Sequence, residues 1–222
     1  MPPGEPLLRP TWVVDHLGVI GSRLVEHLEM TATAVVIGFI ISFVLAIAIR
    51  RRRTVTAAVI GTAGILYAIP SLALFAFLIP FTGLGFLTAE IALTGYTLLI
   101  LIRNVLLGLD SVPPDVLEAA SGMGYTPWQR LWRVELPIAL PIIVAGLRIA
   151  TVTTIGLVTV TALIGQGGLG YLIVVAGLNA FFPTASWVGA ILSVALAVAA
   201  DLLLLAAQRL LTPWSRARRA TS

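Results

Sequence analysis

Long stretches without a charged residue alternate with short arginine-rich segments along this chain. Residues 30–49 carry no charge and are followed at once by a run of four arginines. Between residues 54 and 109 the only charged side chains are Glu90 and Arg103, and residues 149–200 carry none. Because roughly 20 apolar residues in a helix cross the hydrocarbon core of a bilayer, this pattern predicts membrane-spanning helices.

The two longer uncharged stretches are each long enough for two spans. At about 1.5 Å per residue, a single helix over residues 54–109 would be far longer than a membrane is thick. Proline and glycine between Pro80 and Gly85 favour a turn there, and the glycine-rich segment 165–170 divides the second stretch. The sequence therefore predicts an all-α membrane protein with five transmembrane helices. Their expected bounds are residues 30–49, 55–79, 86–108, 138–163 and 185–208.

The distribution of arginine predicts the orientation of these spans. All of the basic residues are arginine, and membrane proteins concentrate such residues in cytoplasmic loops. If residues 50–53 are cytoplasmic, five alternating spans leave only Arg9 and Arg23 outside, whereas four or six spans would break this segregation. The N-terminus is then outside, and residues 209–222 form a basic cytoplasmic tail. The other arginines expected on the cytoplasmic side are Arg130, Arg133, Arg209, Arg216, Arg218 and Arg219.

Residues 1–29 are predicted to form an extracytoplasmic segment ahead of the first span. This segment contains several acidic residues and lacks the apolar core of a signal peptide, so we do not expect it to be cleaved. Its apolar positions share one helical face, which predicts a short amphipathic helix. The pattern does not separate a helix on the outer membrane surface from one packed on the protein's own outer rim. The face consists of Val13, Leu17, Ile20, Leu24 and Leu28.

Composition narrows the class of protein further. Of 222 residues, 59% are hydrophobic and 11% are charged, whereas soluble domains carry about 25% charged residues, so much of the surface must face lipid. The absence of cysteine excludes a disulfide framework and a thiolate metal site. The arginines are spread over several loops rather than gathered on one face, which argues against nucleic acid as a partner.

The polar segment of residues 110–137 has the signals of an ordered loop. Pro113 and Pro114 suit an opening helical turn, and the glycines at 122 and 124 suit its end. Thr126-Pro127-Trp128-Gln129 has the pattern of a capping box at the start of a second helix. Because connections between helices are usually about 4–6 residues long, this loop predicts a docking surface rather than a plain connector.

The same loop resembles the EAA loop of permease subunits in bacterial ABC importers. Glu118-Ala119-Ala120 is followed after three residues by Gly124, and after nine more by Val134-Glu135-Leu136-Pro137. The family pattern has isoleucine where this chain has Val134. Segments at 67–73, 101–104 and 162–170 are similar to the glycine betaine/carnitine/choline permeases, so the resemblance extends over residues 30–209.

The resemblance implies a function and a set of partners. Such a subunit spans the bacterial inner membrane, where two permease subunits, identical or different, form one pathway for a solute delivered by an extracytoplasmic substrate-binding protein. ATP and Mg²⁺ belong to cytoplasmic ABC ATPase subunits, so this chain is expected to need no cofactor and to be a transport subunit rather than an enzyme. The residues implied to couple the ATPase to the membrane are Glu118, Ala119, Ala120, Gly124, Leu136 and Pro137, the last two at the join with the fourth span.

The sequence also indicates that the energy for transport comes from outside this chain. The chain has no lysine and therefore no Gly-x-x-x-x-Gly-Lys-Ser/Thr phosphate-binding loop. Gly165-x-Gly167-x-x-Gly170 formally matches a dinucleotide-binding fingerprint, but it lies between two spans and no acidic residue follows about 20 positions further on. We interpret it as a tight outer turn, in which glycine allows two helices to approach or bend.

Ionisable residues inside the spans are functional candidates, because burying a charge in lipid costs about 2.5–3.5 kcal/mol. We expect Glu90 to reach the headgroups at the outer end of its span. Arg103 is expected to act as an inner-end anchor that braces the polar loop, for example through Asp110. The residues of a possible intramembrane polar network are Arg103, Asn104, Arg148 and Asp201.

Three alternatives remain open from the sequence. Methionine importers have permeases of similar length and span number, so an amino acid such as methionine is the alternative substrate to glycine betaine, choline or carnitine. A gradient-driven secondary transporter would show paired intramembrane acids or inverted repeats, whereas Glu90 and Asp201 lie towards opposite membrane faces. A membrane enzyme would show a buried His/Asp/Glu cluster, whereas His16 and His27 both fall in the outer segment.

Overall fold

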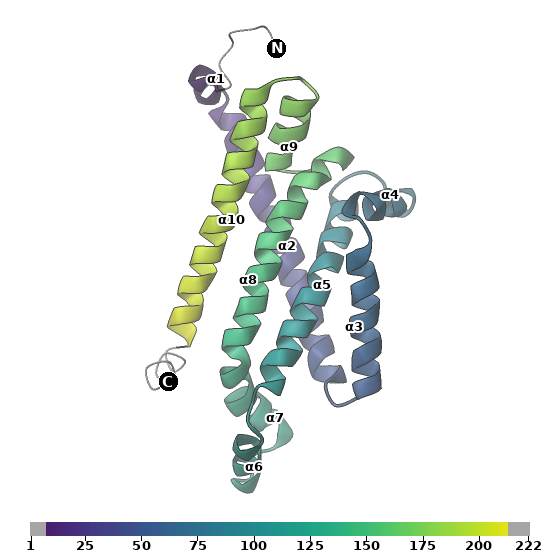
Figure 1. Ribbon diagram of the computed structural model, residues 1–222, viewed down its shortest axis with the longest axis vertical. Helices are drawn as coiled ribbons and strands as arrows, with labels where there is room; N and C mark the ends of the chain where they lie inside the picture. Colours follow the sequence, from purple (N-terminus) through teal and green to yellow (C-terminus); the bar gives the residue numbers. More distant parts are fainter. Residues whose placement is uncertain (1–7, 213–222) are drawn as a thin grey trace.

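The computed structural model describes residues 8–212 of the chain. Within this range the chain forms helices and the turns between them, and no strand (Figure 1). The all-α prediction is therefore confirmed. Most of the predicted basic tail, including Arg216, Arg218 and Arg219, lies outside the described residues, as do the first seven residues.

Four helices of the described range are long and apolar enough to cross a membrane. They are α2 (Leu17–Ile49), α5 (Phe86–Asp110), α10 (Pro183–Leu211) and a helical run over Pro127–Ile164 that contains α8 (Leu136–Val160). α3 (Arg53–Ala68) and α4 (Ser71–Thr82) add a fifth span if this bent pair is counted as one. The structure thus contains four or five candidate spans, whereas the sequence predicts five.

The span predicted over residues 55–79 is broken in the structure. α3 and α4 are bent by 97° relative to each other, and the break lies at Ile69 and Pro70. Proline lacks an N–H and disfavours helical backbone in the residue before it, so α3 ends there. The Tyr96 hydroxyl donates a hydrogen bond of 2.5 Å to the Ile69 carbonyl oxygen, which stabilises the break.

The helix that contains the first predicted span begins before residue 30. α2 runs without interruption from Leu17 to Ile49, so the segment expected to form a separate amphipathic helix is divided between α1 (Pro10–Asp15) and the first turns of α2. Residues 22–29 contain no proline or glycine to stop the helix. Arg23 pairs with Glu26 at 2.6 Å, and its guanidinium lies over the ring of Tyr171.

His27 is fully buried, contrary to its expected place in an outer surface segment. Its Nε2–H donates to the carbonyl oxygen of Ile155 in α8 at 3.1 Å, and its Nδ1 accepts the N–H of Leu169 at 3.3 Å. Leu169 opens α9 (Leu169–Ile173), a short helix that the sequence analysis does not predict. Gly168 has φ +46° and lies so close to the backbone of His27 that a Cβ would collide with it. The glycine-rich segment is therefore a turn, as predicted, and it also brings α9 against α2.

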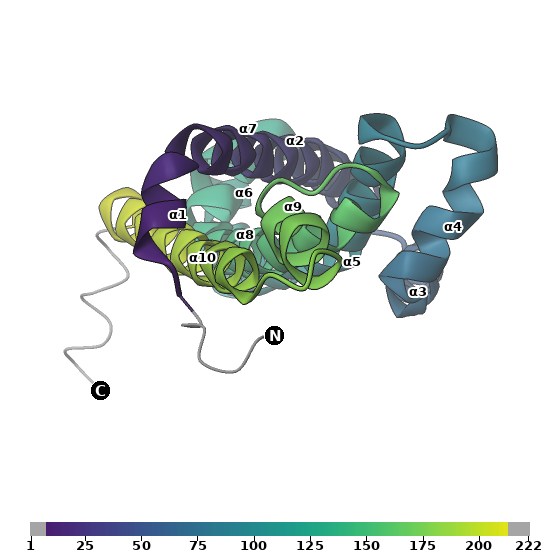
Figure 2. The ribbon, with the colours of Figure 1, turned by 90° about the horizontal axis from the view of Figure 1, so that it is seen from above.

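The bundle is built around α5, which packs against α8 and α2 (Figures 1 and 2). Glycines allow the closest helix crossings. A Cβ on Gly38 of α2 would overlap Thr97 of α5, and one on Gly146 of α8 would overlap Asn104 of α5. Small residues at such crossings are typical of membrane helices, where close van der Waals packing drives association. α10 lies along α8 and α9.

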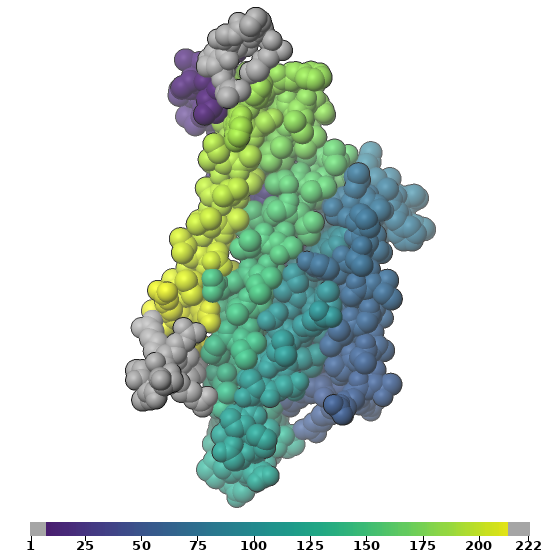
Figure 3. Space-filling view, viewed as in Figure 1, coloured from purple at the N-terminus to yellow at the C-terminus, as the bar shows by residue number. Residues whose placement is uncertain are grey.

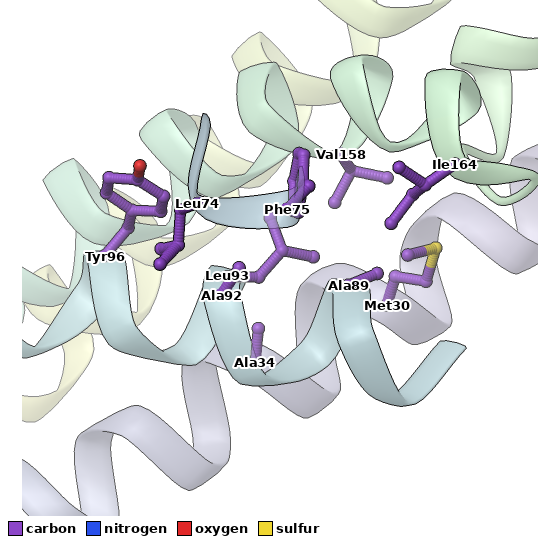
Figure 4. Packing of buried hydrophobic residues seen from close by; sticks show 10 residues of the cluster. All are labelled: Met30, Ala34, Leu74, Phe75, Ala89, Ala92, Leu93, Tyr96, Val158 and Ile164. Carbon is purple, nitrogen blue, oxygen red and sulfur yellow. The ribbon is translucent and has the colours of Figure 1, made fainter. Parts of the chain in front are cut away.

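One hydrophobic cluster fills the half of the bundle next to α4. It joins residues of α2, α4, α5, α8 and the 3-10 turn Thr161–Ile164 that follows α8, and Phe75 of α4 is fully buried within it (Figure 4). The cluster consists of Met30, Ala34, Leu74, Phe75, Ala89, Ala92, Leu93, Tyr96, Val158 and Ile164. A second cluster around Ile102, Leu131 and Ile143 fills the opposite half, so the core extends along the bundle.

Glu90 is buried rather than exposed at the membrane boundary. The residue is 6% exposed, and neither carboxylate oxygen has a hydrogen-bond partner among the described residues. Both α2 and α4 pack against this end of α5. They enclose Glu90, although the hydropathy pattern places it near the end of a span. The expectation that Glu90 reaches the headgroups is therefore wrong.

Candidate functional site

The loop between α5 and α8 extends beyond one end of the bundle, as Figures 1 and 3 show. It contains α6 (Pro114–Gly122), α7 (Pro127–Arg130) and a π-helical turn (Leu131–Glu135) that leads directly into α8. We refer to residues 110–137 as the loop 110–137 and to this end of the bundle as the loop end.

Local sequence signals explain why the loop is ordered. Pro113 has extended backbone just before α6, Pro114 occupies its first turn, and Asp115 lies near the positive end of the helix dipole. At the start of α7, Thr126 Oγ1 accepts the N–H of Gln129 at 3.2 Å, and Gln129 Oε1 accepts the N–H of Thr126 at 2.9 Å. This capping box satisfies backbone donors that would otherwise face water unpaired.

Gly124 makes the turn between the two short helices. Its φ is +82°, a left-handed conformation that a residue with a Cβ adopts only with strain, although no atom lies within 4 Å of the position a Cβ would take. Gly122, two residues earlier, also has open space at that position but no such backbone requirement. Glycine at 124 is therefore required by the backbone, and its exposed surface leaves room for close contact.

The exposed face of the loop combines small, apolar and acidic residues. Glu118, Ala119 and Gly124 are exposed, and beside them Met123 is 68% and Trp128 64% exposed. Large apolar side chains exposed together at the surface mark a site of interaction. Ala120 is only 1% exposed and faces the protein interior, so it supports the loop from within rather than lining this surface. Leu136 and Pro137 lie half-buried at the start of α8.

A buried ion cluster fixes the loop to the bundle. Glu135 is 3% exposed, and its carboxylate accepts hydrogen bonds from Arg130 at 2.9 Å and from Arg50 at the end of α2. Arg130 also donates to Ser121 Oγ of α6 at 3.1 Å. The cluster therefore connects α6, α7 and α8 to α2. The sequence analysis uses Arg50 and Arg130 only to orient the spans, although a glutamate at 135, five residues after Arg130, is a signal for local pairing.

The four residues of the possible intramembrane network do not form one network. Arg148 of α8 and Asp201 of α10 form a bidentate pair, with both N–O distances at 2.8 Å. Asn104 donates to the Ile100 carbonyl of its own helix at 2.8 Å. Arg103 is exposed, and no ion pair joins it to Asp110 within the described range. The pair Arg148–Asp201 thus links two spans, while Arg103 lies apart from it.

The arrangement as a whole presents a contact surface. In residues 8–212 no three His, Cys, Asp or Glu side chains gather in a way that could hold a metal ion. The loop presents a partly apolar face on two short helices, and the ion pairs of Glu135 hold these helices to the bundle. Such a face is suited to seat against another protein and to transmit its movement to α2 and α8.

Comparison with known proteins places this geometry in context. Residues 34–216 match the family described as binding-protein-dependent transport system inner membrane component. The chain is 40% identical over 188 residues to the glycine betaine/carnitine/choline transport system permease protein OpuCB of Bacillus subtilis, covering 85% of this chain and 86% of that one. It is also 40% identical over 207 residues to the osmoprotectant import permease protein OsmW of Salmonella typhimurium, covering 91% and 96%. Its fold is similar to a chain of the inward-facing MetNI methionine ABC transporter, with TM-score 0.75, 27% identity, and 85% and 94% of the two chains covered.

Proposed function

The chain belongs to the family of binding-protein-dependent transport system inner membrane components, and we propose that it is the membrane-spanning permease subunit of an ATP-driven ABC importer for a compatible solute. Glycine betaine, choline or carnitine is the proposed substrate, in keeping with the names of its relatives. The observation that carries the proposal is the ordered, exposed loop 110–137.

The loop is proposed to seat against a cytoplasmic ABC ATPase subunit. Glu118, Ala119 and Gly124 supply the contact surface, with Ala120 holding α6 in place from within. Leu136 and Pro137 join the loop to α8. Through Glu135 the movement of the ATPase reaches α2 as well as α8, because Arg50 connects these elements.

The proposed role of the loop implies where the other subunits of the importer lie. The loop end lies in the cytoplasm of a bacterial cell and α1 outside, where a substrate-binding protein delivers the solute. A second permease subunit, identical or related, completes the pathway in the inner membrane. ATP and Mg²⁺ are bound by the ATPase subunits, so this chain itself carries no cofactor.

Gly124→Asp tests the coupling role of the loop. A charged side chain at this exposed, left-handed position both strains the turn and keeps another surface away. We expect co-purification of the ATPase and substrate-stimulated ATP hydrolysis by the reconstituted complex to fall at least about tenfold, the loss typical of a disrupted interface centre. Gly165→Asp is the matched control, because Gly165 also has open space and a similar φ, +85°, but lies at the opposite end of the bundle.

Two results would contradict this role. If Gly124→Asp retained its ATPase and normal uptake, the loop would be a connector, and a gradient-driven carrier would become the better explanation. If Gly165→Asp lost its ATPase to the same extent, the effect would reflect general misfolding of strained glycine turns.

The substrate is tested separately from the coupling. Likeness to the MetNI methionine transporter, at 27% identity, makes methionine the alternative. We expect cells that express the complete importer and lack other carriers to take up labelled glycine betaine, choline or carnitine but not methionine. Uptake of methionine alone would reassign the substrate while leaving the permease function intact.

A further inference from the structure

A groove rich in arginine lies at the loop end, between α3 and the last turns of α5. Its volume is about 770 Å³, and its charged lining consists of Arg50, Arg53 and Arg103, with Asp110 as the acidic member. Of the three arginines, Arg50 is already paired with Glu135. The groove therefore has a clear excess of positive charge.

Within the described part of the chain, two of its cations have no partner. Among residues 8–212, neither the Arg53 nor the Arg103 side chain takes part in a hydrogen bond or ion pair. Arg103 lies seven residues before the end of α5, about 10 Å along the helix axis, at 1.5 Å per residue. Because an unpaired cation at that depth is unfavourable in lipid, an anion bound in the groove would stabilise it.

The walls between these charges are mostly apolar, with Thr54 and Thr56 as the polar members. Ala57 and Ile60 of α3 line one side, and Leu106 and Leu107 of α5 line the other. Leu107 is 59% exposed on the surface of the bundle. The apolar part of these walls adds nothing to the binding of a small free anion, whereas a molecule that carries both a phosphate and hydrocarbon chains matches both parts of the groove.

We propose that this groove binds the headgroup of one anionic phospholipid, with its phosphate at Arg53 and Arg103 and its acyl chains along Ile60 and Leu107. Basic pockets between transmembrane helices bind anionic headgroups by this combination of charge and apolar surface. Assignment to the inner leaflet rests on the proposed orientation, in which residues 50–53 are cytoplasmic. The binding site itself does not depend on the transported solute.

Two double variants that remove the same charge test the proposal. Arg53→Gln/Arg103→Gln removes two cations that line the groove, whereas Arg51→Gln/Arg52→Gln removes two exposed arginines of the same turn that do not line it. The full chain is purified in mild detergent with any subunits that remain bound. It is then titrated with phosphatidylglycerol or phosphatidylcholine, and bound lipid is counted by native mass spectrometry.

We expect the groove variant to bind phosphatidylglycerol at least about tenfold more weakly and the control variant to change by less than about twofold. Phosphatidylcholine should bind more weakly to the unaltered chain, and millimolar inorganic phosphate should not displace the lipid. Arg103→Lys, which keeps the charge, should retain most of the binding. If thermal unfolding shows that the groove double variant does not fold, the preference for phosphatidylglycerol and the competition by inorganic phosphate, both measured on the unaltered chain, still test the proposal.

Several outcomes would overturn the proposal. Equal losses in the two double variants would assign the binding to surface charge in general. Equal affinity for both lipids, or displacement by inorganic phosphate, would rule out recognition of an anionic phospholipid. If the groove variant kept its lipid but lost co-purifying ATPase subunits, the groove would instead be a contact for that protein.

Discussion

Single residues hold the loop 110–137 against the bundle, and Glu135 does so through two arginines from different helices. Its carboxylate is buried, and it accepts from Arg50 and Arg130. Removing the charge of one member of a buried ion cluster leaves the opposite charges uncompensated, which typically costs about 3–5 kcal/mol. We therefore expect Glu135→Gln to lower the thermal unfolding midpoint of the purified chain by several degrees and to weaken substrate-stimulated ATP hydrolysis.

Glu118→Gln provides the matched comparison, since it makes the same chemical change at an exposed carboxylate of the same loop. Its free energy of unfolding should change by no more than an ordinary surface substitution causes, about 0.5 kcal/mol, while binding of the ATPase weakens. If Glu135→Gln and Glu118→Gln unfolded at the same temperature, the ion cluster would contribute nothing to the position of the loop.

The sequence predicts the local turns of the loop 110–137 better than it predicts which distant residues pair in the fold. The proline, glycine and capping signals between Pro113 and Gln129 act over a few residues, so the local turns were readable in advance. The link from Arg50 to Glu135 spans 85 residues, and the link from His27 to Ile155 spans 128. No periodicity or spacing rule predicts such pairs, because they depend on which helix faces come together.

At the scale of secondary-structure elements, the crossing of α5 and α8 depends on Gly146. A Cβ there would overlap Asn104, so Gly146→Ala must push the two helices apart or displace the asparagine. Overpacking of this kind costs about 1–3 kcal/mol. We expect a lower unfolding midpoint and less folded protein in the membrane, measured by thermal unfolding and by size-exclusion chromatography with a fluorescent fusion.

Gly156→Ala is the control for this change, because Gly156 lies on the same helix with no atom within 4 Å of its Cβ position. There the substitution should be neutral or stabilising by up to about 1 kcal/mol, as alanine favours helix over glycine. Asn104→Gly combined with Gly146→Ala moves the small residue to the other helix and should restore part of the stability. Equal stability of the two alanine variants would show that the crossing is not tight.

The sequence predicted some elements closely and missed others for identifiable reasons. α5 and α10 begin and end within a few residues of the spans expected at 86–108 and 185–208, because long, mostly apolar runs with turn residues near their ends define a helix well. The break at Pro70 lies inside such a run, and counting charges does not detect it. The apolar helix over Leu169–Leu178 is too short to register as a span.

At the scale of the whole molecule, the number of crossings depends on whether the bent pair of α3 and α4 traverses the membrane. With five crossings, residues in α1 and in the turn after α4 lie on the same side, and the loop 110–137 lies on the other. With four, α1 and that turn lie on opposite sides. The segregation of arginine favours five, because it places the loop end with residues 50–53 in the cytoplasm.

Single cysteines can decide between the two, because the chain contains no cysteine of its own. Val14, Leu84 and Met123 are 66%, 72% and 68% exposed, so each tolerates a substitution that leaves all charges in place. We expect a membrane-impermeant maleimide to label Val14→Cys and Leu84→Cys in intact spheroplasts, and Met123→Cys only after permeabilisation. Labelling of all three after denaturation checks that each thiol is present.

Each departure from this labelling pattern has a definite meaning. If Val14→Cys and Leu84→Cys reacted from opposite sides, the bent pair would be re-entrant and the molecule would have four crossings. If each of the three cysteines reacted from the side opposite to the one expected, the number of crossings would still be five. The loop 110–137 would then face outward, where no ATP-hydrolysing subunit can reach it. That result would also contradict the proposed coupling role of Gly124, because this role requires the loop end to be cytoplasmic. The side of the membrane on which Met123 reacts therefore decides whether the charge pattern, the loop and the proposed source of energy are mutually consistent.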